Sequence, residues 1–262
     1  MKQVKAKIIS NQEIAPERFL MRLATPGVAR IAKPGQFVMV KCSADSRFML
    51  RRPFAFHRIR RDFFDILYQM VGEGTELLSR REKGDTIDII GPLGNGFSID
   101  KIRTMNHQII LVAGGIAVAP LLALAETLAH SGKSIAQSVI IGARIKNHIL
   151  CVNDFKKLGF KVEVATEDGS MGHKGLACDL LKTALRNTHN AIRTTIYACG
   201  PKAMLKEVAN VSGHNNIHCE VSLEEKMACG MGVCFGCAVK TKEGYKQVCK
   251  DGPVFDAREI VW

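Results

Sequence analysis

The feature that most constrains the fold is a change of rhythm near residue 105 of this 262-residue chain. Before this point, short apolar or alternating runs are separated by turn signals, and the clearest runs are 4–10, 19–23, 36–40 and 65–69. Closely spaced short strands predict a small antiparallel β-barrel, with one helix expected from Gly74 to a stop at Gly84. After this point, strand-like runs alternate with helical patterns, which predicts a doubly wound parallel sheet covered on both faces.

The second region has predicted strands at 108–113, 138–142, 161–166, 194–198 and 217–221. Its predicted helices lie at 120–130, 149–158, 176–185 and 202–212. In the first region, turns are expected at Pro26-Gly27, Pro34-Gly35 and Gly91-Pro92. The alternation stops after Val221, where a cysteine- and glycine-rich tail begins. We therefore divide the chain into a barrel domain (1–102), an α/β domain (103–221) and a tail (222–262).

Composition and charge exclude several classes of protein. Hydrophobic residues make up 47% and charged residues 24%, which suits a globular chain with a core and excludes disorder. The net charge of +12 is compatible with nucleic acid, a membrane surface, anionic cofactors or simply a solvated basic surface. The first residues lack the apolar core of a signal peptide, and the most apolar run, 109–125, is too short to span a bilayer. We expect a cytoplasmic protein that binds neither nucleic acid nor membrane, and an odd number of cysteines, nine, fits a reducing compartment.

The tail carries the most specific chemical signal. Its cysteines are spaced C-x4-C-x2-C-x11-C, the plant-type arrangement for a [2Fe–2S] cluster, at Cys229, Cys234, Cys237 and Cys249. Four thiolates must converge on two irons, and we expect so tight a loop to need the backbone freedom of Gly230, Gly232 and Gly236. No charged side chain lies between Cys229 and Cys237, which leaves backbone N–H groups free to point at sulfur.

A structural zinc site is the alternative for these cysteines. Such sites more often pair two CxxC units, whereas this stretch has one CxxC and a wider partner, so the spacing favours iron–sulfur. The remaining cysteines lie in separate predicted elements, and we expect most of them to be small buried apolar residues. They are Cys42, Cys151, Cys178, Cys199 and Cys219.

Two strand–helix turns of the α/β region are candidate phosphate sites. Gly114-Gly115 follows an apolar strand and precedes a helix with Pro120 in its first turn, where unpaired N–H groups would face a pyrophosphate. Cys199-Gly200-Pro201 ends a later strand, at the edge where open α/β sheets bind ligands. Either turn alone is equally compatible with a tight connection that binds nothing, but two in one sheet favour a dinucleotide.

The barrel region contains a further candidate set. Arg51-Arg52 precedes a strand and Gly72-Glu73-Gly74-Thr75 opens the predicted helix, so an arginine fork and a helix start would grip a second pyrophosphate. A surface basic pair followed by an ordinary capped helix would give the same pattern.

Together these motifs resemble the ferredoxin–NADP reductase superfamily, in which an FAD-binding barrel precedes a nicotinamide-binding α/β domain. More narrowly, nearly the whole chain resembles the electron-transfer subunits of B-type, NAD-linked dihydroorotate dehydrogenases. The matching motifs run in family order: Arg52-Pro53, Leu67-Tyr68-Gln69, Gly74-Thr75, 91–96, Gly114-Gly115 with Ala119-Pro120, 166–170, 199–201, and finally 222–229 through 249–255.

The resemblance implies a set of cofactor ligands and no catalytic side chain. FAD would be held by Arg52, Pro53, Phe54, Ala55, Leu67, Tyr68, Gln69, Gly74 and Thr75, with its phosphates at Arg52 and the Gly74-Thr75 helix start. The nicotinamide dinucleotide would be framed by Gly114, Gly115, Thr166, Cys199, Gly200 and Pro201. The cluster would be ligated by Cys229, Cys234, Cys237 and Cys249.

Two positions depart from the family pattern. Ala55 stands where the family usually has a serine or threonine, whose hydroxyl would face the flavin, and Ala117 stands where it usually has glycine. We expect the missing hydroxyl to shift the flavin potential or slow hydride transfer. We expect the Cβ of Ala117 to crowd the approach to a pyrophosphate.

The order of electron carriers follows from their chemistry. Nicotinamides exchange two electrons as a hydride and an iron–sulfur cluster passes one, so FAD must lie between them. The three parts use up the chain and leave no room for a substrate domain such as a TIM barrel of about 250 residues. By resemblance, substrate is oxidised on an FMN-containing dihydroorotate dehydrogenase subunit, in a heterotetramer. Electrons would run from dihydroorotate through FMN, the cluster and FAD to NAD⁺, in pyrimidine synthesis.

Two other functions remain open from the sequence. One is a reductase subunit of another oxidoreductase, such as an NADH–ferredoxin–NADP transhydrogenase or a sulfide dehydrogenase, against which the four cysteines argue. The other is a redox sensor or a zinc-stabilised binding module. The family implies NAD, but Arg144 and Lys146 after the second α/β strand leave NADP open.

Overall fold

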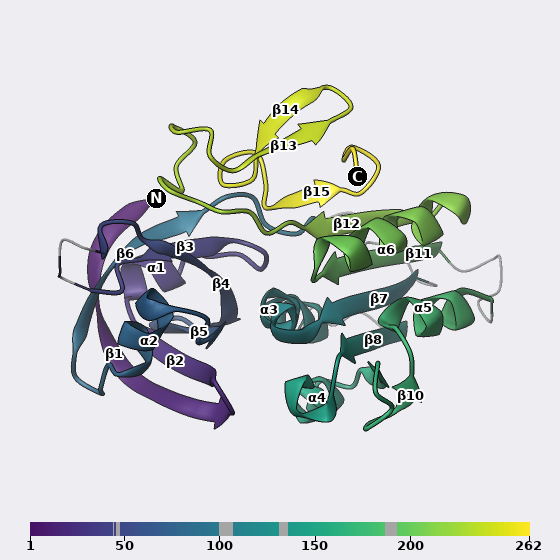
Figure 1. Cartoon of the computed structure of the whole chain (residues 1–262), viewed down its shortest axis with the longest axis horizontal. Coiled ribbons are helices and arrows are strands. Elements are labelled where there is room, and N and C mark those ends of the chain that lie inside the picture. The colour runs from purple at the N-terminus through teal and green to yellow at the C-terminus, as the bar shows by residue number, and fades with distance from the viewer. Residues whose placement is uncertain (44, 46–47, 100–106, 131–135, 187–192) are drawn as a thin grey trace.

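The computed structural model describes residues 1–262 except 44, 46–47, 100–106, 131–135 and 187–192. A closed barrel lies beside an α/β sheet, and a small C-terminal module lies above the junction between them (Figure 1). This arrangement confirms the predicted fold class.

The barrel is antiparallel, with strand order β1-β2-β5-β4-β3-β6. Its elements are β1 (Lys2–Ala15), β2 (Arg18–Ala24), α1 (Pro26–Ala29), β3 (Phe37–Val40), β4 (Arg52–Ile59), β5 (Phe63–Gln69), α2 (Glu73–Ser79) and β6 (Thr86–Leu93). Side chains alternate along the strands: Met21 and Leu23 point into the barrel core, whereas Arg22 between them points to the other face, where it pairs with the buried Asp65 at 2.8 Å.

Two predictions for the barrel are wrong. Gly91-Pro92 lies inside β6 and not in a turn, because Gly91 pairs with Lys2 and has no room for a side chain beside Val38, whose Cγ1 would lie 2.6 Å from a Cβ. The helix predicted to reach Gly84 ends at Ser79. The intervening residues form a turn that is closed by the Asp85 carboxylate.

The α/β sheet has the order β10-β9-β8-β7-β11-β12-β15 among the described residues. Its strands are β7 (His107–Gly114), β8 (Ala136–Ala143), β9 (Lys161–Thr166), β10 (His173–Lys174), β11 (Arg193–Cys199), β12 (His218–Ser222) and β15 (Val254–Asp256). The pairs from β10 to β12 are parallel, and β15 joins β12 antiparallel. All of the strands predicted for this region are therefore present, within a few residues at each end.

Helices cover both faces of this sheet, as predicted. They are α3 (Val118–Ala129) and α4 (Val152–Lys157) on one face and α5 (Ala177–Arg186) and α6 (Lys202–His214) on the other, with short 3-10 turns at Gly115–Ala117 and Lys146–His148 (Figure 1). Helix α4 begins later than predicted because Cys151 has φ +64°, which a right-handed helix cannot contain.

Helix α3 is apolar around nearly its whole circumference because it is covered on two sides. It packs on β7 and β11 of the sheet and on β4 of the barrel. Figure 1 shows it between the two units. The helix therefore connects the core of the α/β unit to the wall of the barrel.

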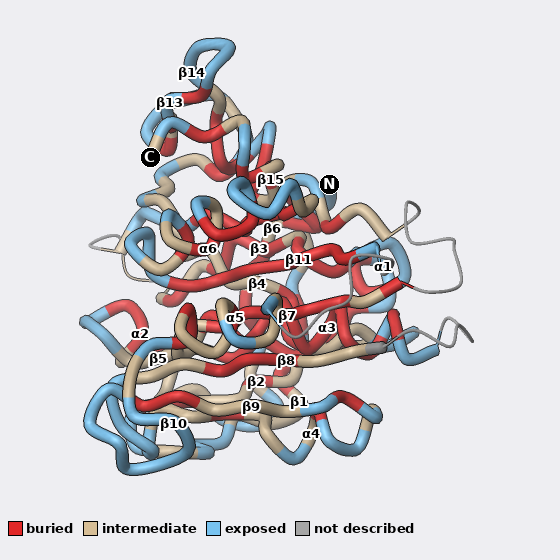
Figure 2. The backbone as a smooth tube through the Cα atoms, turned by 90° about the vertical axis from the view of Figure 1, so that its right-hand side faces the viewer, coloured by how far each residue is buried: buried red, intermediate tan, exposed pale blue. Residues whose placement is uncertain are grey.

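The C-terminal module is not an independent domain. After a loop come β13 (Ala238–Thr241) and β14 (Gly244–Gln247), and the chain then returns as β15 to the edge of the main sheet. Val239 and Val248 of the module belong to the same buried cluster as Phe37 of the barrel and Val221 of the sheet. Figure 2 shows this continuity as buried segments running from the sheet into the module, whose outer hairpin is exposed.

No helix in the described part of the chain is long and apolar enough to cross a membrane.

Candidate functional site

A pocket of about 850 Å³ opens between the barrel, the α/β unit and the C-terminal module. Its size lies in the upper part of the range for small-molecule and cofactor sites. We call it the interdomain pocket. It is lined by Gly35, Phe37, Phe48, 52–55, 67–69, 71–75, 116–117, 119–120, Cys199, 222–227 and Pro253.

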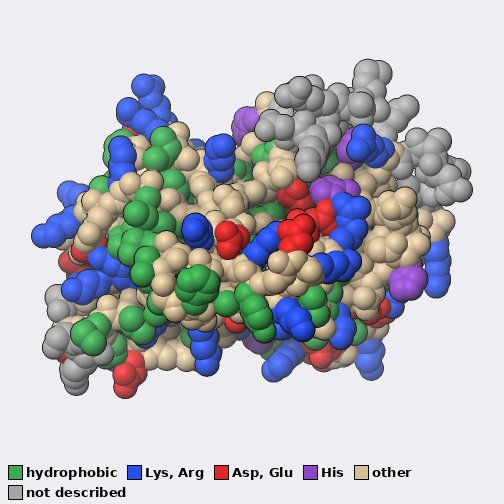
Figure 3. All heavy atoms as spheres, turned by 90° about the horizontal axis from the view of Figure 1, so that it is seen from above, with side chains coloured by type: hydrophobic (Ala, Val, Ile, Leu, Met, Phe, Trp, Pro, Cys, Tyr) green, Lys and Arg blue, Asp and Glu red, His purple; other side chains and the backbone are tan. Residues whose placement is uncertain are grey.

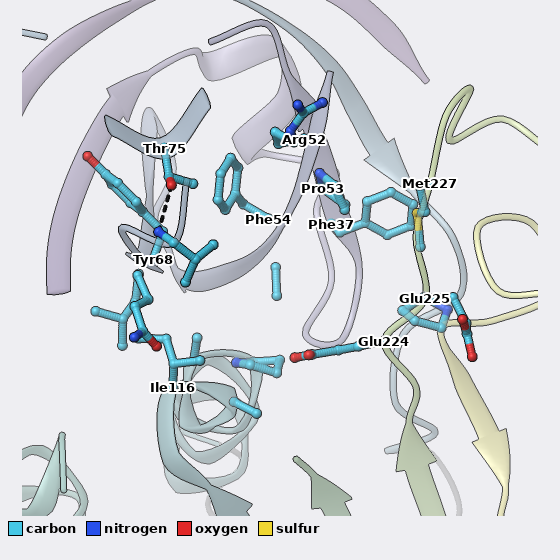
Figure 4. A pocket seen from close by; sticks show the side chains of 18 of the residues that line it. Phe37, Arg52, Pro53, Phe54, Tyr68, Thr75, Ile116, Glu224, Glu225 and Met227 are labelled. Carbon is cyan, nitrogen blue, oxygen red and sulfur yellow. Dashed lines mark hydrogen bonds between the residues drawn. The ribbon is translucent and has the colours of Figure 1, made fainter. Parts of the chain in front are cut away.

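The barrel side of the pocket contains every residue that the resemblance assigned to FAD. These residues come from the start of β4, the end of β5 and the start of α2, which the barrel closure brings together (Figure 4). The guanidinium of Arg52 lies against the turn at Gly74, where a Cβ would be 3.4 Å from Arg52 Nε. A cation and a backbone turn therefore face the same space.

The predicted arginine fork is wrong. Arg51 does not line the pocket; its guanidinium pairs with Asp88 at 3.0 Å and donates to the Asp88 carbonyl oxygen at 2.9 Å. Consecutive residues at the start of a strand point to opposite sides, so only Arg52 can reach the pocket.

Thr75 shapes the turn before α2. Its hydroxyl accepts the N–H of Val71 at 2.9 Å and that of Gly72 at 3.2 Å, and it donates to the Gly72 carbonyl oxygen (Figure 4). Thr75 thereby fixes the backbone that faces Arg52. Nearby, the Phe54 ring packs edge-on against Tyr68 with centroids 5.6 Å apart, which gives the pocket an aromatic wall.

The α/β side of the pocket is formed by the turn between β7 and α3. Ile116, Ala117, Ala119 and Pro120 line the pocket here, together with Cys199 at the end of β11. Of the residues that the resemblance assigned to the nicotinamide dinucleotide, Cys199 is the one that lines this pocket.

Two of the other residues predicted for the nicotinamide dinucleotide, Gly114 and Gly200, allow neighbouring turns to come into contact. A Cβ on Gly114 would lie 2.6 Å from Pro201 Cδ and 3.2 Å from Gly200 Cα, so the turns after β7 and β11 touch through their backbones. Gly115 has φ +57°, in the left-handed region. Thr166 lies further away, at the end of β9. Its hydroxyl donates to the Met171 carbonyl oxygen at 2.9 Å and accepts the Met171 N–H at 3.0 Å.

Ala117 does not need glycine's conformational freedom. Its φ of −69° and ψ of 3° suit any residue, and its side chain is almost fully buried in the pocket wall. The Cβ of Ala117 therefore reduces the space in the pocket but does not strain the backbone.

The start of the tail forms a further wall of the pocket that was not predicted from the sequence. Residues 222–227 line the pocket, and Glu224 points into it opposite the barrel residues (Figure 4). Desolvation by burial raises the pKa of the Glu224 carboxyl. The signal that could have found these residues is their place in the family motif 222–229.

The tail cysteines lie as two neighbouring pairs. The backbone N–H of Cys249 donates to Cys237 Sγ at 3.4 Å, and the thiols of Cys229 and Cys234 are close enough to influence each other's ionisation. Cys237 and Cys249 are buried, Cys229 is half-buried and Cys234 is exposed. In the described residues, no three His, Cys, Asp or Glu side chains are grouped to hold one metal ion.

Backbone N–H groups surround these sulfurs, as predicted. Cys229 Sγ accepts from Met231 and Val233 at 3.4 Å, and Cys249 Sγ accepts from Gly232 at 3.1 Å. Against the desolvation by burial, backbone hydrogen bonds lower the pKa of Cys229 to about 6. Such N–H groups stabilise negative charge on sulfur, as an anionic iron–sulfur centre requires.

The loop that carries the cysteines departs from prediction at one glycine. Gly230 and Gly232 have φ of +70° and +80°, but the third left-handed residue is Phe235, at +57°, and not Gly236. A Cβ on Gly230 would also lie 2.5 Å from Met39 Cγ, so this glycine is needed for packing on the barrel as well.

The remaining cysteines behave largely as predicted. Cys42, Cys178, Cys199 and Cys219 are buried and Cys151 is half-buried. Burial raises the pKa of the Cys42 and Cys178 thiols to about 11, which makes them inert at neutral pH.

Comparison with known proteins places this architecture in a family. Residues 224–261 match the family described as the iron-sulfur cluster binding domain of dihydroorotate dehydrogenase B, and residues 111–210 match the oxidoreductase NAD-binding domain. The chain is 38% identical to the electron transfer subunit of dihydroorotate dehydrogenase B (NAD(+)) from Desulforamulus reducens, over 98% of this chain and 97% of that one. It is 40% identical to the subunit of the same name from Caldanaerobacter subterraneus, over 99% of both.

The chain belongs to the family of dihydroorotate dehydrogenase B electron transfer subunits. This confirms the resemblance drawn from the sequence, and it makes the chain a component of an NAD-linked flavin and iron–sulfur oxidoreductase. Among solved structures, the chain is similar to the NADH-dependent reduced ferredoxin-NADP oxidoreductase, with a TM-score of 0.85 and 30% identity over 99% of this chain and 90% of that one. The family match does not favour the alternative function as a reductase subunit of a transhydrogenase or a sulfide dehydrogenase. Nor does it favour a zinc site in the tail.

Proposed function

We propose that this electron transfer subunit passes electrons between a [2Fe–2S] cluster in its tail, FAD in the interdomain pocket, and NAD. The observation that carries the proposal is the continuity of the two sites. The pocket begins at Arg52 in the barrel and extends to Met227, two residues before the first cluster cysteine, Cys229.

The FAD assignment rests on the residues of the barrel wall. The pocket is large enough, mostly apolar, and carries Arg52 as a cation beside the Gly72–Thr75 turn, which suits a flavin joined to a pyrophosphate. We assign FAD to Arg52, Pro53, Phe54, Ala55, Leu67, Tyr68, Gln69, Gly74 and Thr75, among which Thr75 acts by shaping the turn.

The nicotinamide assignment rests on the opposite wall. We propose that the turn from Gly114 to Pro120 and the turn at Cys199–Pro201 bind NAD, since both lie at the carboxyl ends of neighbouring parallel strands. Thr166 would act indirectly, because its hydroxyl holds the turn after β9. Bound in this way, FAD would exchange a hydride with nicotinamide on one side and single electrons with the cluster on the other.

The cluster assignment rests on the two thiol pairs. We propose that Cys229 and Cys234 ligate one iron and that Cys237 and Cys249 ligate the other, because each pair is already in contact. The backbone N–H groups at 231–233 would stabilise the charge of the centre. Zinc would need these four thiols around a single ion.

The electron partner would dock on the exposed side of the cluster. Around the exposed Cys234, the side chains of Met231, Val233 and Phe235 are 40%, 74% and 65% exposed. Figure 3, which looks down on this face, shows hydrophobic side chains gathered there. An apolar patch of this kind is typical of a protein interface. We propose an FMN-containing dihydroorotate dehydrogenase catalytic subunit as the occupant, in a cytoplasmic heterotetramer used in pyrimidine synthesis.

Co-purification under anaerobic conditions tests this function. The chain should carry flavin and about two irons with acid-labile sulfide, and its complex with the catalytic subunit should reduce NAD⁺ with dihydroorotate. A colourless protein, or a complex that reduces NAD⁺ with reduced ferredoxin but not with dihydroorotate, would refute it. The second result would instead support the transhydrogenase function.

A further inference from the structure

Strand β4 contains a bulge just after its pocket residues. Phe56 pairs with Ile66 of β5, but Arg58 pairs with the next residue back, Asp65, so His57 is the extra residue. Without it, Arg58 would lie opposite Phe64, whose ring is fully buried in the barrel core. The bulge therefore turns Arg58 outward, next to His57, toward helix α3.

A nearly buried carboxylate on α3, that of Glu126, pairs with two arginines at the end of this strand. Glu126 is 7% exposed, and its two oxygens accept from the guanidinium of Arg60 at 2.7 and 2.8 Å. Arg58 donates to the same carboxylate at 3.1 Å and, with its other nitrogen, to Asp154 of α4 at 2.7 Å. Two barrel arginines thus bind two helices of the α/β unit. Bidentate pairs of this kind fix orientation as well as distance.

His57 adds a contact nearer the pocket. Its Nδ1 lies 3.2 Å from the carbonyl oxygen of Ala119. A carbonyl oxygen only accepts, so Nδ1 carries the proton and donates. Desolvation by burial, aided by the positive charge of Arg58, lowers the pKa of His57 to about 4, so the ring is neutral at pH 7. The hydrogen bond to Ala119 and the charges of Asp65 and Asp154 act in the opposite direction and are weaker.

The contacts join two rigid elements that both end at the pocket. Ala55 and its neighbours line the pocket two residues before His57 on β4, and Ala119 and Pro120 line it within the first turn of α3. We propose that His57, Arg58 and Arg60, through Ala119 and Glu126, are positioning residues that hold the nicotinamide-binding turn at a fixed distance from the flavin. This inference rests on the proposed function, because it concerns the geometry of hydride transfer in that pocket.

We call the contacts of His57, Arg58 and Arg60 with Ala119, Glu126 and Asp154 the clamp. Other contacts keep the barrel and the α/β unit attached when the clamp is broken. Near the segment that connects them, the Tyr197 hydroxyl of β11 donates to the Ser98 carbonyl oxygen at 2.9 Å, and the Tyr197 ring packs on Phe97. Loss of the clamp is therefore expected to change the orientation of the units without separating them. Because a misplacement of about 1 Å can lower a rate by roughly 100-fold, orientation alone is sufficient to affect transfer.

Anaerobic stopped-flow reduction by NADH tests the proposal in the full chain with both cofactors. The reaction is NADH + H⁺ + FAD → NAD⁺ + FADH₂. In Glu126→Gln, the limiting rate of flavin bleaching should fall on the order of tenfold or more, whereas the NADH dissociation constant changes less than about threefold. Glu207→Gln is the matched control, since Glu207 pairs with Lys182 at 2.7 Å within the α/β unit. Its limiting rate should equal that of the wild type.

Arg60 supplies a second test on a residue that is more exposed. Arg60→Gln should slow bleaching, and Arg60→Lys, which keeps the charge but cannot form the bidentate pair with Glu126, should restore only part of the rate. Independently of turnover, amide hydrogen exchange in α3 should accelerate in Glu126→Gln and not in Glu207→Gln. Rates in Glu126→Gln and Arg60→Gln within about twofold of the Glu207→Gln control would overturn the proposal. A wild-type chain that binds FAD but is not reduced by NADH would instead overturn the proposed function, and the clamp with it.

Discussion

The four cysteines that we propose as cluster ligands come from one short stretch, 229–249, whereas the walls of the interdomain pocket come from residues as far apart as Gly35 and Pro253. The cysteine loop is also open to the surface at Cys234, while the pocket lies between three units of the fold. A short-range site can be specified by spacing alone. A pocket assembled from distant segments depends on every strand register that separates them.

The two sites also differ in how they stabilise charge. Around the cysteines, backbone N–H groups do so, and no charged side chain is involved between Cys229 and Cys237. In the pocket, a single guanidinium, that of Arg52, faces the turn at Gly72–Thr75. Single side-chain substitutions should therefore act differently on the two sites, and the following experiments use that difference.

The largest effect is expected at the buried thiol of Cys237. Cys237→Ser removes a ligand from a centre that has four, so iron content and the electron paramagnetic resonance signal of the reduced cluster should be essentially lost while FAD stays bound. Cys199→Ser, at another buried cysteine, should retain about two irons. An intact cluster in Cys237→Ser would show that Cys237 is not a cluster ligand.

A smaller loss is expected on the barrel wall. Arg52→Ala removes a charge-assisted hydrogen-bond donor, worth about 2–3 kcal/mol, so the FAD dissociation constant should rise roughly 30- to 150-fold with full iron content. Fluorescence titration of the FAD-depleted chain measures this. Arg51→Ala is the control, because Arg51 pairs with Asp88 outside the pocket. Equal loss of FAD in both variants would contradict the assignment of Arg52.

The pH dependence of stability should report on the junction between the units. His57 has a folded pKa of about 4 against 6.5 in a free chain, so the unfolded state takes up the proton first. Stability is therefore complete above pH 6.5 and falls as the pH drops toward 4, by roughly 3 kcal/mol at most. Denaturant unfolding at pH 7 and pH 4.5 measures the loss. His57→Gln should reduce this pH dependence, and an unchanged slope would contradict a buried neutral ring.

The smallest effect is expected at Ala55. Ala55→Ser restores a hydroxyl on the pocket wall, and one hydrogen bond of about 1 kcal/mol corresponds to a shift on the order of 20 mV in a two-electron couple. Spectroelectrochemical titration of the flavin would detect it, with the cluster potential as an internal control. An unchanged flavin potential together with an unchanged rate of reduction by NADH would remove the idea.

The sequence by itself determined the local features. The cysteine spacing indicated a tight loop, and the need for glycine at 230 and 232 and the alternation of strand and helix after residue 105 were predicted, because each depends on near neighbours in the chain. The residues next to Arg52 were assigned from the family resemblance, and they line the pocket. The wrong predictions also came from the local sequence. Gly91-Pro92 has the composition of a turn, but β6 accepts it because Val38 fills the space beside Gly91.

Only the tertiary structure decided which distant residues share a wall. Arg51 and Arg52 are adjacent in sequence, yet one pairs with Asp88 and the other faces the pocket. The return of β15 to β12 and the contact of Arg60 with Glu126 could not be predicted either. Each depends on strand register, a bulge or a helix packed on two sides, and these are fixed by burial across the whole molecule and not by neighbours in the chain.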